Sequence, residues 1–461
     1  MRKEVYMRYS YLFLPIMALL MCISVPGLSL AQEGPKIDTG DTAWMLTSSL
    51  LVLMMTIPGL FLFYGGLVRS KNALGTFMHS FFITALVSIQ WVVIGYTLAF
   101  GPDISHIIGG LDWLGLKGVG AEPSDVWATT IPHNLFMVYQ LTFAVITVAL
   151  ITGSFAERAK FSTFIIFVLL WTTVIYDPLA HWVWGGGWIG AMGALDFAGG
   201  TVVHISSGAA ALAAALMFGK RIGYGREPMA PHFLPYSVIG ASLLWVGWFG
   251  FNAGSAVAAN GLASTAFVTT NTATAAAVLG WVFVEWIVRG KPTVLGAASG
   301  AVAGLVAITP AAGFVTPMAA IIVGLGGGIF CFFAVNLRPK LGYDDSLDVV
   351  GVHGVGGTWG ALATGLFATT AVNSAGRDGL FYGHPEQLWI QFIGVAATWV
   401  FSFVGTMIIL AILKAVMGLK VSPEKEIEGL DLGEHGEEAY SGFQLAQGYG
   451  TPEHARRLSD E

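Results

Sequence analysis

The stretch DFAGGTVVHISSG at residues 196–208 places an ionisable side chain, His204, among glycines and β-branched residues typical of a buried segment. A second stretch, VVGVHGVGG at 349–357, places His353 in the same surroundings. Asp196 precedes His204 by eight residues, and Asp345 precedes His353 by the same interval. An ionisable group is costly to bury in an apolar segment, so two matched examples indicate a functional site inside the fold.

Composition excludes a water-soluble globule. The chain has 461 residues, of which 55% are hydrophobic and 11% charged, whereas soluble domains carry roughly a quarter charged residues. We therefore expect an all-α polytopic membrane protein. The net charge of -6 comes largely from the tail after Pro423 and indicates no nucleic-acid partner. Cys22 and Cys331 both lie in apolar runs, which predicts neither a disulfide framework nor a metal site.

Residues 1–31 are predicted to be a signal peptide. Basic residues precede the apolar run 11–30, and Ser29-Leu30-Ala31 fits the small-x-small cleavage rule. The alternative is an additional first span interrupted at Pro26. Cleavage would leave the mature N-terminus outside.

Eleven apolar runs follow, separated by short polar connectors. Each is about the 20 residues that cross a hydrocarbon layer, or longer, and backbone groups in lipid must be paired internally, so helices are expected. The predicted spans are 42–67, 74–100, 134–154, 161–179, 200–218, 235–255, 263–288, 293–311, 317–336, 348–370 and 387–416.

The charges of the connectors predict the orientation. One alternate set is rich in lysine and arginine, and the other carries little beyond Lys117 and Arg377. By the positive-inside rule the first set is cytoplasmic, which puts the N-terminus outside and the C-terminus inside. The basic residues of this set are Arg69, Lys71, Arg158, Lys160, Lys220, Arg221, Arg226, Arg289, Lys291, Arg338 and Lys340.

The chain also contains an internal sequence repeat whose two copies have opposite orientations. PGLFLFYGG (58–66) in the first span resembles GWFGFNAGS (247–255) in the sixth, and the histidine stretches lie in the fifth and tenth. Because five spans separate the copies, the second copy enters the membrane from the opposite face, as in the inverted repeats of transporters. Chance similarity among glycine-rich apolar segments is the alternative.

Two readings of the histidines are open. Each imidazole could form one hydrogen bond across a helix contact, worth about 1 kcal/mol. Their matched positions beside glycines favour a shared site instead, in which a mostly neutral pair holds one proton between them. No carboxylate or thiol is expected to accompany them in the spans, which argues against a metal site or an enzyme.

Aromatic residues gather at the outer ends of spans three, four and six. Most such residues belong to the interfacial belt, which is the simple reading for Trp182 and Trp188. Trp184, between valine and three glycines, could instead form a vestibule with Phe143 and Tyr139. Rings that face a small cation attract it by roughly 0.5–2 kcal/mol.

The motifs DFAGGTVVH, GWFGFNAGSA, VVGVHGVGG and AERAKFS (156–162) closely resemble the ammonium transporter (Amt/Mep/Rh) family, in its bacterial Amt-type form. The resemblance runs from about residue 41 to EGLDLGEHGEEAY (428–440). It implies eleven helices in an inverted five-plus-five repeat, assembled as a homotrimer in the inner (plasma) membrane with one pore per subunit. It implies no cofactor and no enzymatic activity.

The resemblance also implies roles for individual residues. His204 and His353 would be the twin-histidine pair that lines the pore and relays protons. Phe143, Trp184 and Ser255 would form the outer ammonium site, and Phe143 would stack with Phe251 as a gate. Asp196 matches the aspartate needed to recruit ammonium, and is expected to order the vestibule. Tyr139 stands where many bacterial members have phenylalanine.

Elementary energetics explains why such a pore would deprotonate its cargo. Moving an ammonium-sized ion into low dielectric costs on the order of 20 kcal/mol. Removing a proton of pKa about 10.4 at neutral pH costs roughly 5 kcal/mol. We therefore expect ammonium, or methylammonium as its analogue, to be captured outside and to cross as the neutral amine while the proton follows a separate route.

The chain divides into a transmembrane domain, 41–420, and a cytoplasmic tail, 421–461. The end of the tail reads as disordered, and its earlier part resembles the family's region that packs on neighbouring subunits and is contacted by PII-type (GlnK-class) signal proteins. The alternative function is an ammonium sensor that signals through a partner protein.

Overall fold

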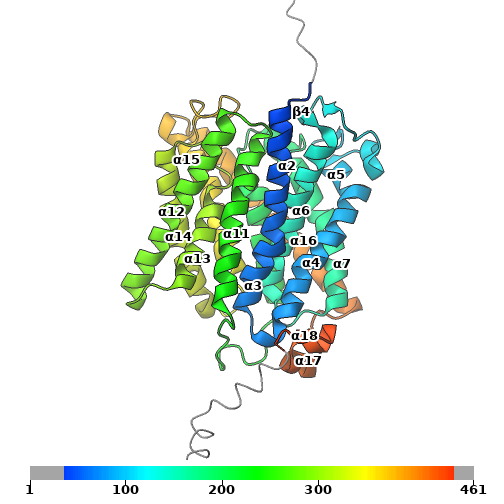
Figure 1. Cartoon of the computed structure of the whole chain (residues 1–461), viewed down its shortest axis with the longest axis vertical. Coiled ribbons are helices and arrows are strands. Elements are labelled where there is room, and N and C mark those ends of the chain that lie inside the picture. Colours follow the sequence, from blue (N-terminus) through cyan, green and yellow to red (C-terminus); the bar gives the residue numbers. More distant parts are fainter. Residues whose placement is uncertain (1–35, 441–461) are drawn as a thin grey trace, which may run out of the picture.

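The structure is a computed structural model that describes residues 36–440. The helices run side by side from one end of the molecule to the other (Figure 1). The predicted signal peptide, 1–31, and the last part of the tail lie outside the described residues.

Within the described residues, nine helical segments are long and apolar enough to span a membrane. Several consist of α-helical and π-helical pieces in series. The nine are Thr39–Leu67 (α2, Thr39–Met54; η1, Met55–Leu60; α3, Phe61–Leu67), Ser70–Phe100 (η2, Ser70–Asn72; α4, Ala73–Gln90; η3, Trp91–Gly95; α5, Tyr96–Phe100), His133–Phe155 (α6), Phe161–Ala191 (α7, Phe161–Trp171; η5, Thr172–Tyr176; α8, Asp177–Val183; α9, Trp188–Ala191), Gly200–Phe218 (η6, Gly200–Ile205; α10, Ser206–Phe218), Leu234–Ala256 (α11, Leu234–Ala253; η7, Gly254–Ala256), Gly261–Arg289 (α12), Pro317–Leu341 (α14) and Pro385–Val416 (α16).

Two of the predicted spans correspond to shorter helical stretches. The run 293–311 contains α13 (Val294–Ile308), and 348–370 contains η8 (Val350–Val355) followed by α15 (Gly356–Phe367). The fourth predicted span, 161–179, ends too early, because α8 continues to Val183 before the glycine-rich turn. The prediction of a multi-pass helical membrane protein is therefore confirmed. Among residues 36–440, nine helical segments are long enough to span a membrane.

Local sequence signals explain where several helices begin and end. The Asn260 side chain accepts hydrogen bonds from the backbone N–H groups of Leu262 and Ala263 at the start of α12. Thr293 caps α13 in the same way, through the N–H of Gly296. These caps satisfy N–H groups that the first helical turn leaves unpaired. Gly290 ends α12 with a φ of +79°, a conformation that favours glycine.

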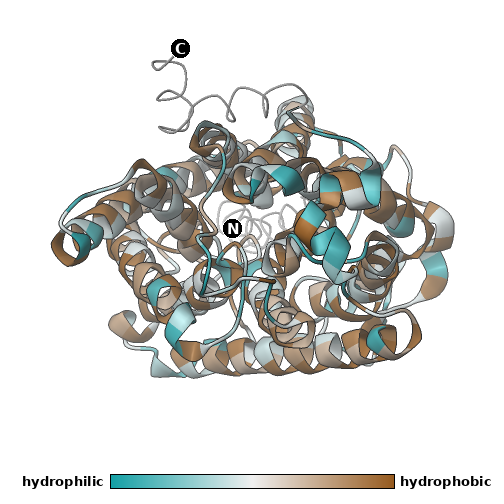
Figure 2. Cartoon of the chain, turned by 90° about the horizontal axis from the view of Figure 1, so that it is seen from below, coloured by the Kyte–Doolittle hydropathy of each residue, from teal (hydrophilic) through white to brown (hydrophobic). Residues whose placement is uncertain are grey.

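The two ends of the bundle differ. One end carries the short hairpins β1 (Asp103–Ile104) with β2 (Ile108–Gly109) and β3 (Pro123–Ser124) with β4 (Ala128–Pro132), together with η4 (Leu111–Leu116). The other carries α17 (Pro423–Glu428) and α18 (Leu430–His435), beneath α4 and α7 in Figure 1. Seen along the bundle in Figure 2, the outward-facing helices are largely hydrophobic, as lipid contact requires.

Helices far apart in sequence meet in the core. The sixth span, α11, packs against α2 and α3 of the first, and η6 contacts η8. In addition, α10 packs against η8, and α15 packs against η6. The histidine-bearing segments therefore lie side by side in the centre of the bundle.

A buried ion cluster joins the connectors at the α17–α18 end. The Arg221 guanidinium pairs with Asp344 (Nη2 to Oδ1, 2.8 Å) and with Glu157 (Nη1 to Oε2, 3.2 Å), while Arg69 also binds Glu157 at 2.7 Å. The Arg221 side chain is only 6% exposed. Burial acts to raise the pKa of Glu157, but Arg221 and Arg69 outweigh it and hold the pKa below its ordinary value.

We predict that Arg221→Met destabilises the protein by about 3–5 kcal/mol, because it leaves the buried Asp344 without its ion-pair partner and removes one of the two cations that bind Glu157. The measurement is thermal unfolding in detergent, with the exposed Arg226→Met as the matched control. Glu157 contributes stability above its unfolded pKa and loses it as the pH falls through its lowered folded pKa. The difference between wild type and Arg221→Met should therefore shrink in acid, and equal unfolding temperatures at neutral pH would contradict the role of the cluster.

Candidate functional site

The centre of the bundle is shaped by glycines that let two helical segments touch. A Cβ added to Gly208 would lie 2.3 Å from both the Cα and the N of Gly354, closer than real atoms approach. A Cβ on Gly357 would come within 3.0 Å of the His204 Cβ. The backbones of α10 and η8 therefore cross without side chains between them. This explains the glycines beside both histidines in the sequence.

The close approach brings the two predicted histidines together. Nδ1 of His353 lies 3.2 Å from Nδ1 of His204, and the ring centroids are 5.3 Å apart. Their residues are 4% and 1% exposed. Each histidine is on a π-helical turn, η8 or η6, a feature often found at functional sites. The Nδ1 contact requires one donor and one acceptor, so the two rings are not both imidazolium.

Thr309 assigns the direction of this hydrogen bond. Its hydroxyl donates to the Leu305 carbonyl at 2.7 Å and accepts from Trp248 Nε1 at 2.8 Å. His204 Nε2, at 3.4 Å, can therefore only donate to this hydroxyl, which leaves His204 Nδ1 as the acceptor. Nδ1 of His353 is then the donor, and its Nε2 carries a free lone pair.

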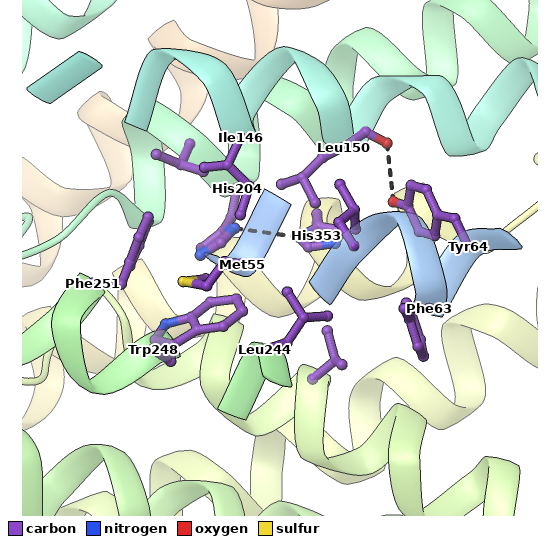
Figure 3. A pocket seen from close by; sticks show the side chains of 13 residues that line it. Met55, Phe63, Tyr64, Ile146, Leu150, His204, Leu244, Trp248, Phe251 and His353 are labelled. Carbon is purple, nitrogen blue, oxygen red and sulfur yellow. Dashed lines mark hydrogen bonds between the residues drawn. The ribbon is translucent and has the colours of Figure 1, made fainter. Parts of the chain in front are cut away.

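A narrow cavity surrounds the pair, and its other lining side chains are almost entirely apolar (Figure 3). Tyr64 brings a hydroxyl, but that group donates to the Leu150 carbonyl at 3.0 Å. Such a lining offers an ion no replacement for its hydration shell. The lining residues are Met55, Leu60, Phe63, Tyr64, Ile146, Leu150, Val203, His204, Leu244, Trp248, Phe251, Val302 and His353.

Two stacked phenylalanines close the cavity on the side of the bundle that carries the β-hairpins. The rings of Phe143 and Phe251 are 4.2 Å apart with an interplanar angle of 18°, and both residues are at most 1% exposed. Phe251 lies 6.1 Å from the ring of His204. The two residues of the predicted gate are therefore in contact, and Phe251 lies beside His204.

The predicted outer-site residues surround this stack. Trp184 meets Phe143 edge-on at 5.9 Å. Ser255 is linked to the stack through Tyr139, whose hydroxyl lies 3.2 Å from Ser255 Oγ and donates to the Phe251 carbonyl at 2.8 Å. Tyr139 and Phe143 are themselves 5.0 Å apart. The departure from phenylalanine at position 139 thus adds a hydroxyl to this network.

The Asp196 side chain accepts hydrogen bonds from backbone N–H groups. One carboxylate oxygen accepts from the N–H groups of Gly199 and Gly200 at 2.8 and 2.6 Å, and the other accepts from Thr201. Its own carbonyl accepts from Trp184 Nε1 at 2.9 Å. Asp196 therefore fixes both the start of η6 and the orientation of Trp184. In the second half, Asp345 accepts from the N–H of Val350 at the start of η8.

The expectation that no carboxylates line the spans is wrong. Asp177 in α8 is fully buried and accepts from Gln90 Nε2 at 2.7 Å. Glu285 in α12 is 2% exposed, pairs with Arg289, and lines a second, wider cavity together with Asp348 and His353. We call this second cavity the inner vestibule. Sequence reasoning overlooked Glu285 because it precedes Arg289 by one helical turn at the end of a span, where ion pairs are common.

Trp248, Thr309 and Tyr64 were also missed as site residues. Trp248 and Tyr64 belong to the two sequence stretches that echo one another, which could have marked them. Thr309 carries no local signal beyond its place before Pro310, because its role depends on the fold bringing α11 and α13 together.

We predict that Gly208→Ala destabilises the protein by about 2 kcal/mol or more, because the new methyl group has no space against Gly354. Thermal unfolding of the purified protein measures the effect. Gly261→Ala is the matched control, since a Cβ there meets nothing within 4 Å. Equal unfolding temperatures for the two variants would contradict the tight crossing.

The chain is similar to known proteins over most of its length. Residues 43–440 match the Ammonium Transporter Family. The chain is 59% identical over 402 residues to an ammonium transporter of Bacillus subtilis (strain 168), covering 87% of this chain and 98% of that protein. The crystal structure of Candida albicans Mep2 superposes with a TM-score of 0.80 at 40% identity, covering 88% and 91% of the two chains. A structure described as a sensor Amt protein superposes with a TM-score of 0.79 at 30% identity, covering 86% and 98%. The match to the family model and the identity to the Bacillus subtilis protein lead to one conclusion: the chain belongs to the ammonium transporter family.

Proposed function

We propose that this transporter captures ammonium at an outer aromatic site, removes its proton and conducts ammonia past His204 and His353. The observation that carries the proposal is the contact of these two imidazoles, 3.2 Å apart, inside an otherwise apolar cavity. Membership of a transporter family also argues against an enzyme.

The outer site offers features that suit a small cation. Trp184 and Phe143 present aromatic rings at a right angle, and such faces attract ammonium by cation–π interaction. Ser255 is only partly buried, and its hydroxyl already donates to the Phe251 carbonyl, so its lone pair is available to accept from the ion. Asp196 supports the site indirectly, by holding the Trp184 indole.

The next step is loss of the proton at the stacked phenylalanines. The closed stack of Phe143 and Phe251 excludes a hydrated ion, and the cavity behind it does not replace the lost water. Carrying the bare ion would cost on the order of 20 kcal/mol, against roughly 5 kcal/mol for deprotonation at neutral pH. The neutral molecule is the form that enters.

The histidine pair then provides the free Nε2 lone pair of His353 as an acceptor and the His204 Nε2–H, 3.4 Å from Thr309 Oγ1, as a donor along an apolar path. Ammonia can both donate to and accept from neutral imidazoles, while the residues that line the narrow cavity offer a metal cation or potassium no carboxylate. His353 lines both the narrow cavity and the inner vestibule, so it lies at the passage from one to the other. The proton follows a separate route, in which the coupled imidazoles act as a relay.

We further propose that residues 41–420 form the transporter domain with eleven crossings, an inverted five-plus-five repeat and an outside N-terminus. Two paired contacts support the repeat: α11 lies on α2, and η6 lies on η8. The matched backbone caps of Asp196 and Asp345 support it too. With the signal peptide of residues 1–31, this topology suits the inner membrane.

We predict that His204→Ala and His353→Ala each lower ammonium flux or admit potassium, because each removes half of the hydrogen-bonding pair and widens the pore. Currents of the purified protein on solid-supported membranes, after ammonium or potassium jumps, measure both properties. His384→Ala is the matched control, since His384 is exposed and pairs with Glu386. Unchanged flux and unchanged exclusion of potassium in both pore variants would refute the role of the pair.

The tail, 421–461, is proposed to be a cytoplasmic regulatory region of a homotrimer, contacted by PII-type signal proteins. Its described part binds the first turns of α4 and α7 of its own chain. Asp431 accepts from the N–H groups of Leu74 and Gly75 at 3.0 and 2.8 Å, and Glu434 accepts from that of Phe161 at 3.0 Å. A protein that displaces these contacts would change the inner end of the bundle.

We predict that a saturating PII-type protein lowers the ammonium current, and that Asp431→Asn weakens the inhibition by loosening α18. Exposed Glu437→Gln is the control. Native mass spectrometry of the same preparation should show three chains. An undiminished current with PII bound, or a monomeric mass, would count against this regulation.

A second candidate function is an ammonium sensor that signals through a partner protein. The observation that favours it is the similarity to the sensor Amt protein at 30% identity. The current measurement separates the two, because a sensor without transport passes no ammonium current while it still binds ammonium.

A further inference from the structure

A segment of the loop after α5 is hydrogen-bonded to the turn that carries Trp184. Within residues 103–107, which we call the strap, His106 Nδ1 lies 2.9 Å from the Gly186 carbonyl, and the His106 carbonyl accepts from the N–H of Trp188 at 3.1 Å. The Ile107 carbonyl accepts from Trp182 Nε1 at 2.8 Å. The central contact is between Asp103 Oδ1 and His181 Nε2, at 2.8 Å.

His181 is held by acceptors on both sides of its ring. Nδ1 lies 3.0 Å from the Ala99 carbonyl, which can only accept, so this nitrogen carries a hydrogen. Nε2 faces the Asp103 carboxylate, which when ionised can also only accept. With an ionised Asp103, both ring nitrogens carry hydrogens and the side chain is an imidazolium. The His181 side chain is 0% exposed.

The surroundings of Asp103 keep it ionised. Its Oδ2 accepts from the backbone N–H of His106 at 3.1 Å, and the side chain is 30% exposed to water. The hydrogen bond from His181 lowers the pKa of Asp103 below its ordinary value. Among the described residues, the further ionisable side chain in ion-pair or hydrogen-bond contact with this pair is His106, whose Nδ1 is 3.3 Å from Oδ2.

The Trp184 turn is built directly on His181. The N–H groups of Gly185 and Gly187 donate to the His181 carbonyl at 3.0 and 2.9 Å. A Cβ on Gly185 would lie 2.0 Å from the Ala99 carbonyl and 2.6 Å from His181 Nδ1. The turn therefore has no space to move unless the imidazole moves. This makes the position of Trp184 dependent on the pair beneath it.

We propose that the His181–Asp103 pair is a proton-dependent positioning element, which holds Trp184 in the geometry that binds ammonium while His181 is protonated. Loss of that proton leaves one ring nitrogen bare, facing either the Ala99 carbonyl at 3.0 Å or the Asp103 carboxylate at 2.8 Å. In either case two lone pairs face one another, so the imidazole moves and the turn built on it is released. The inference rests on the proposed role of Trp184 in the outer site. Its consequence is an apparent KM that rises as the outside pH increases.

The protonation state is tested first, by a measurement that does not need transport. Solid-state 15N NMR of histidine-labelled protein in bilayers should show an imidazolium signal at neutral pH that is absent in His181→Gln. Asp103→Asn should convert the signal to that of a neutral ring. A His181 signal that is neutral in the wild type would overturn the proposal, whatever the protein transports.

The positioning role is tested by ammonium currents at outside pH 6 to 9, with the ammonium ion concentration corrected at each pH. We expect Asp103→Asn and His181→Gln each to raise KM about five-fold near pH 6.5, with little change in maximal current and a flattened pH dependence. The double variant should be no worse than either single one. Asp112→Asn, an exposed acid of the same loop, is the control and should behave as wild type.

Three results would overturn the positioning role: an unchanged pH profile of KM in both variants, an effect on maximal current alone, or additive effects in the double variant. A wild-type protein that passes no ammonium current would instead contradict the proposed transport function. The NMR measurement would still decide the state of His181 in that case.

Discussion

The contact between two glycine-rich backbones is the constraint on which the site depends. Gly208 and Gly354 leave so little space that an added methyl group would collide with main-chain atoms. Only this spacing lets side chains from two separate segments reach across and place two Nδ1 atoms 3.2 Å apart. A shared proton between imidazoles needs that distance, because a hydrogen bond weakens steeply when it lengthens. The packing of small residues therefore sets the distance between the two imidazoles.

Around that contact, the narrow cavity is lined by no acidic or basic side chain other than the two histidines. Arg221 collects Glu157 and Asp344 into a buried cluster at the α17–α18 end, and Asp103 meets His181 at the opposite end. Between the ends, the cavity holds two imidazoles and apolar groups. For the proposed mechanism this matters, because a charged group in the cavity would stabilise an ion there and lessen the difference of roughly 15 kcal/mol that favours a neutral molecule.

The aspartates that precede the two histidines make the same kind of hydrogen bond to the backbone. Asp196 and Asp345 each accept backbone N–H groups at the start of a π-helical turn, and each turn carries a histidine. A carboxylate at a helix N-terminus is favoured by the unpaired N–H groups and by the helix dipole. The equal spacing in the sequence reflects this shared geometry. Asp196 has a second task through its carbonyl, which orients Trp184.

Much of this could be predicted from sequence. Long apolar runs predict membrane helices because lipid cannot satisfy the backbone, and the paired histidine stretches predict one central site because isolated buried imidazoles are costly. Phe143, Phe251 and Trp184 were placed near that site and lie against one another. Span ends were less accurate, as at 161–179, because apolar residues such as Trp182 suit both a helix and an interface.

By itself, then, the sequence determined that the chain is a helical membrane protein of a transporter family with two buried histidines, since these follow from composition, periodicity and motifs. Only the tertiary structure decided which nitrogen donates between His204 and His353, because that depends on Thr309 and Trp248 from other helices. It also decided that Glu285 lines the same cavity as His353 and that Asp177 binds Gln90 in the interior. The physical reason is the same in each case: a hydrogen bond is directional, and its partners come from segments that only folding brings together.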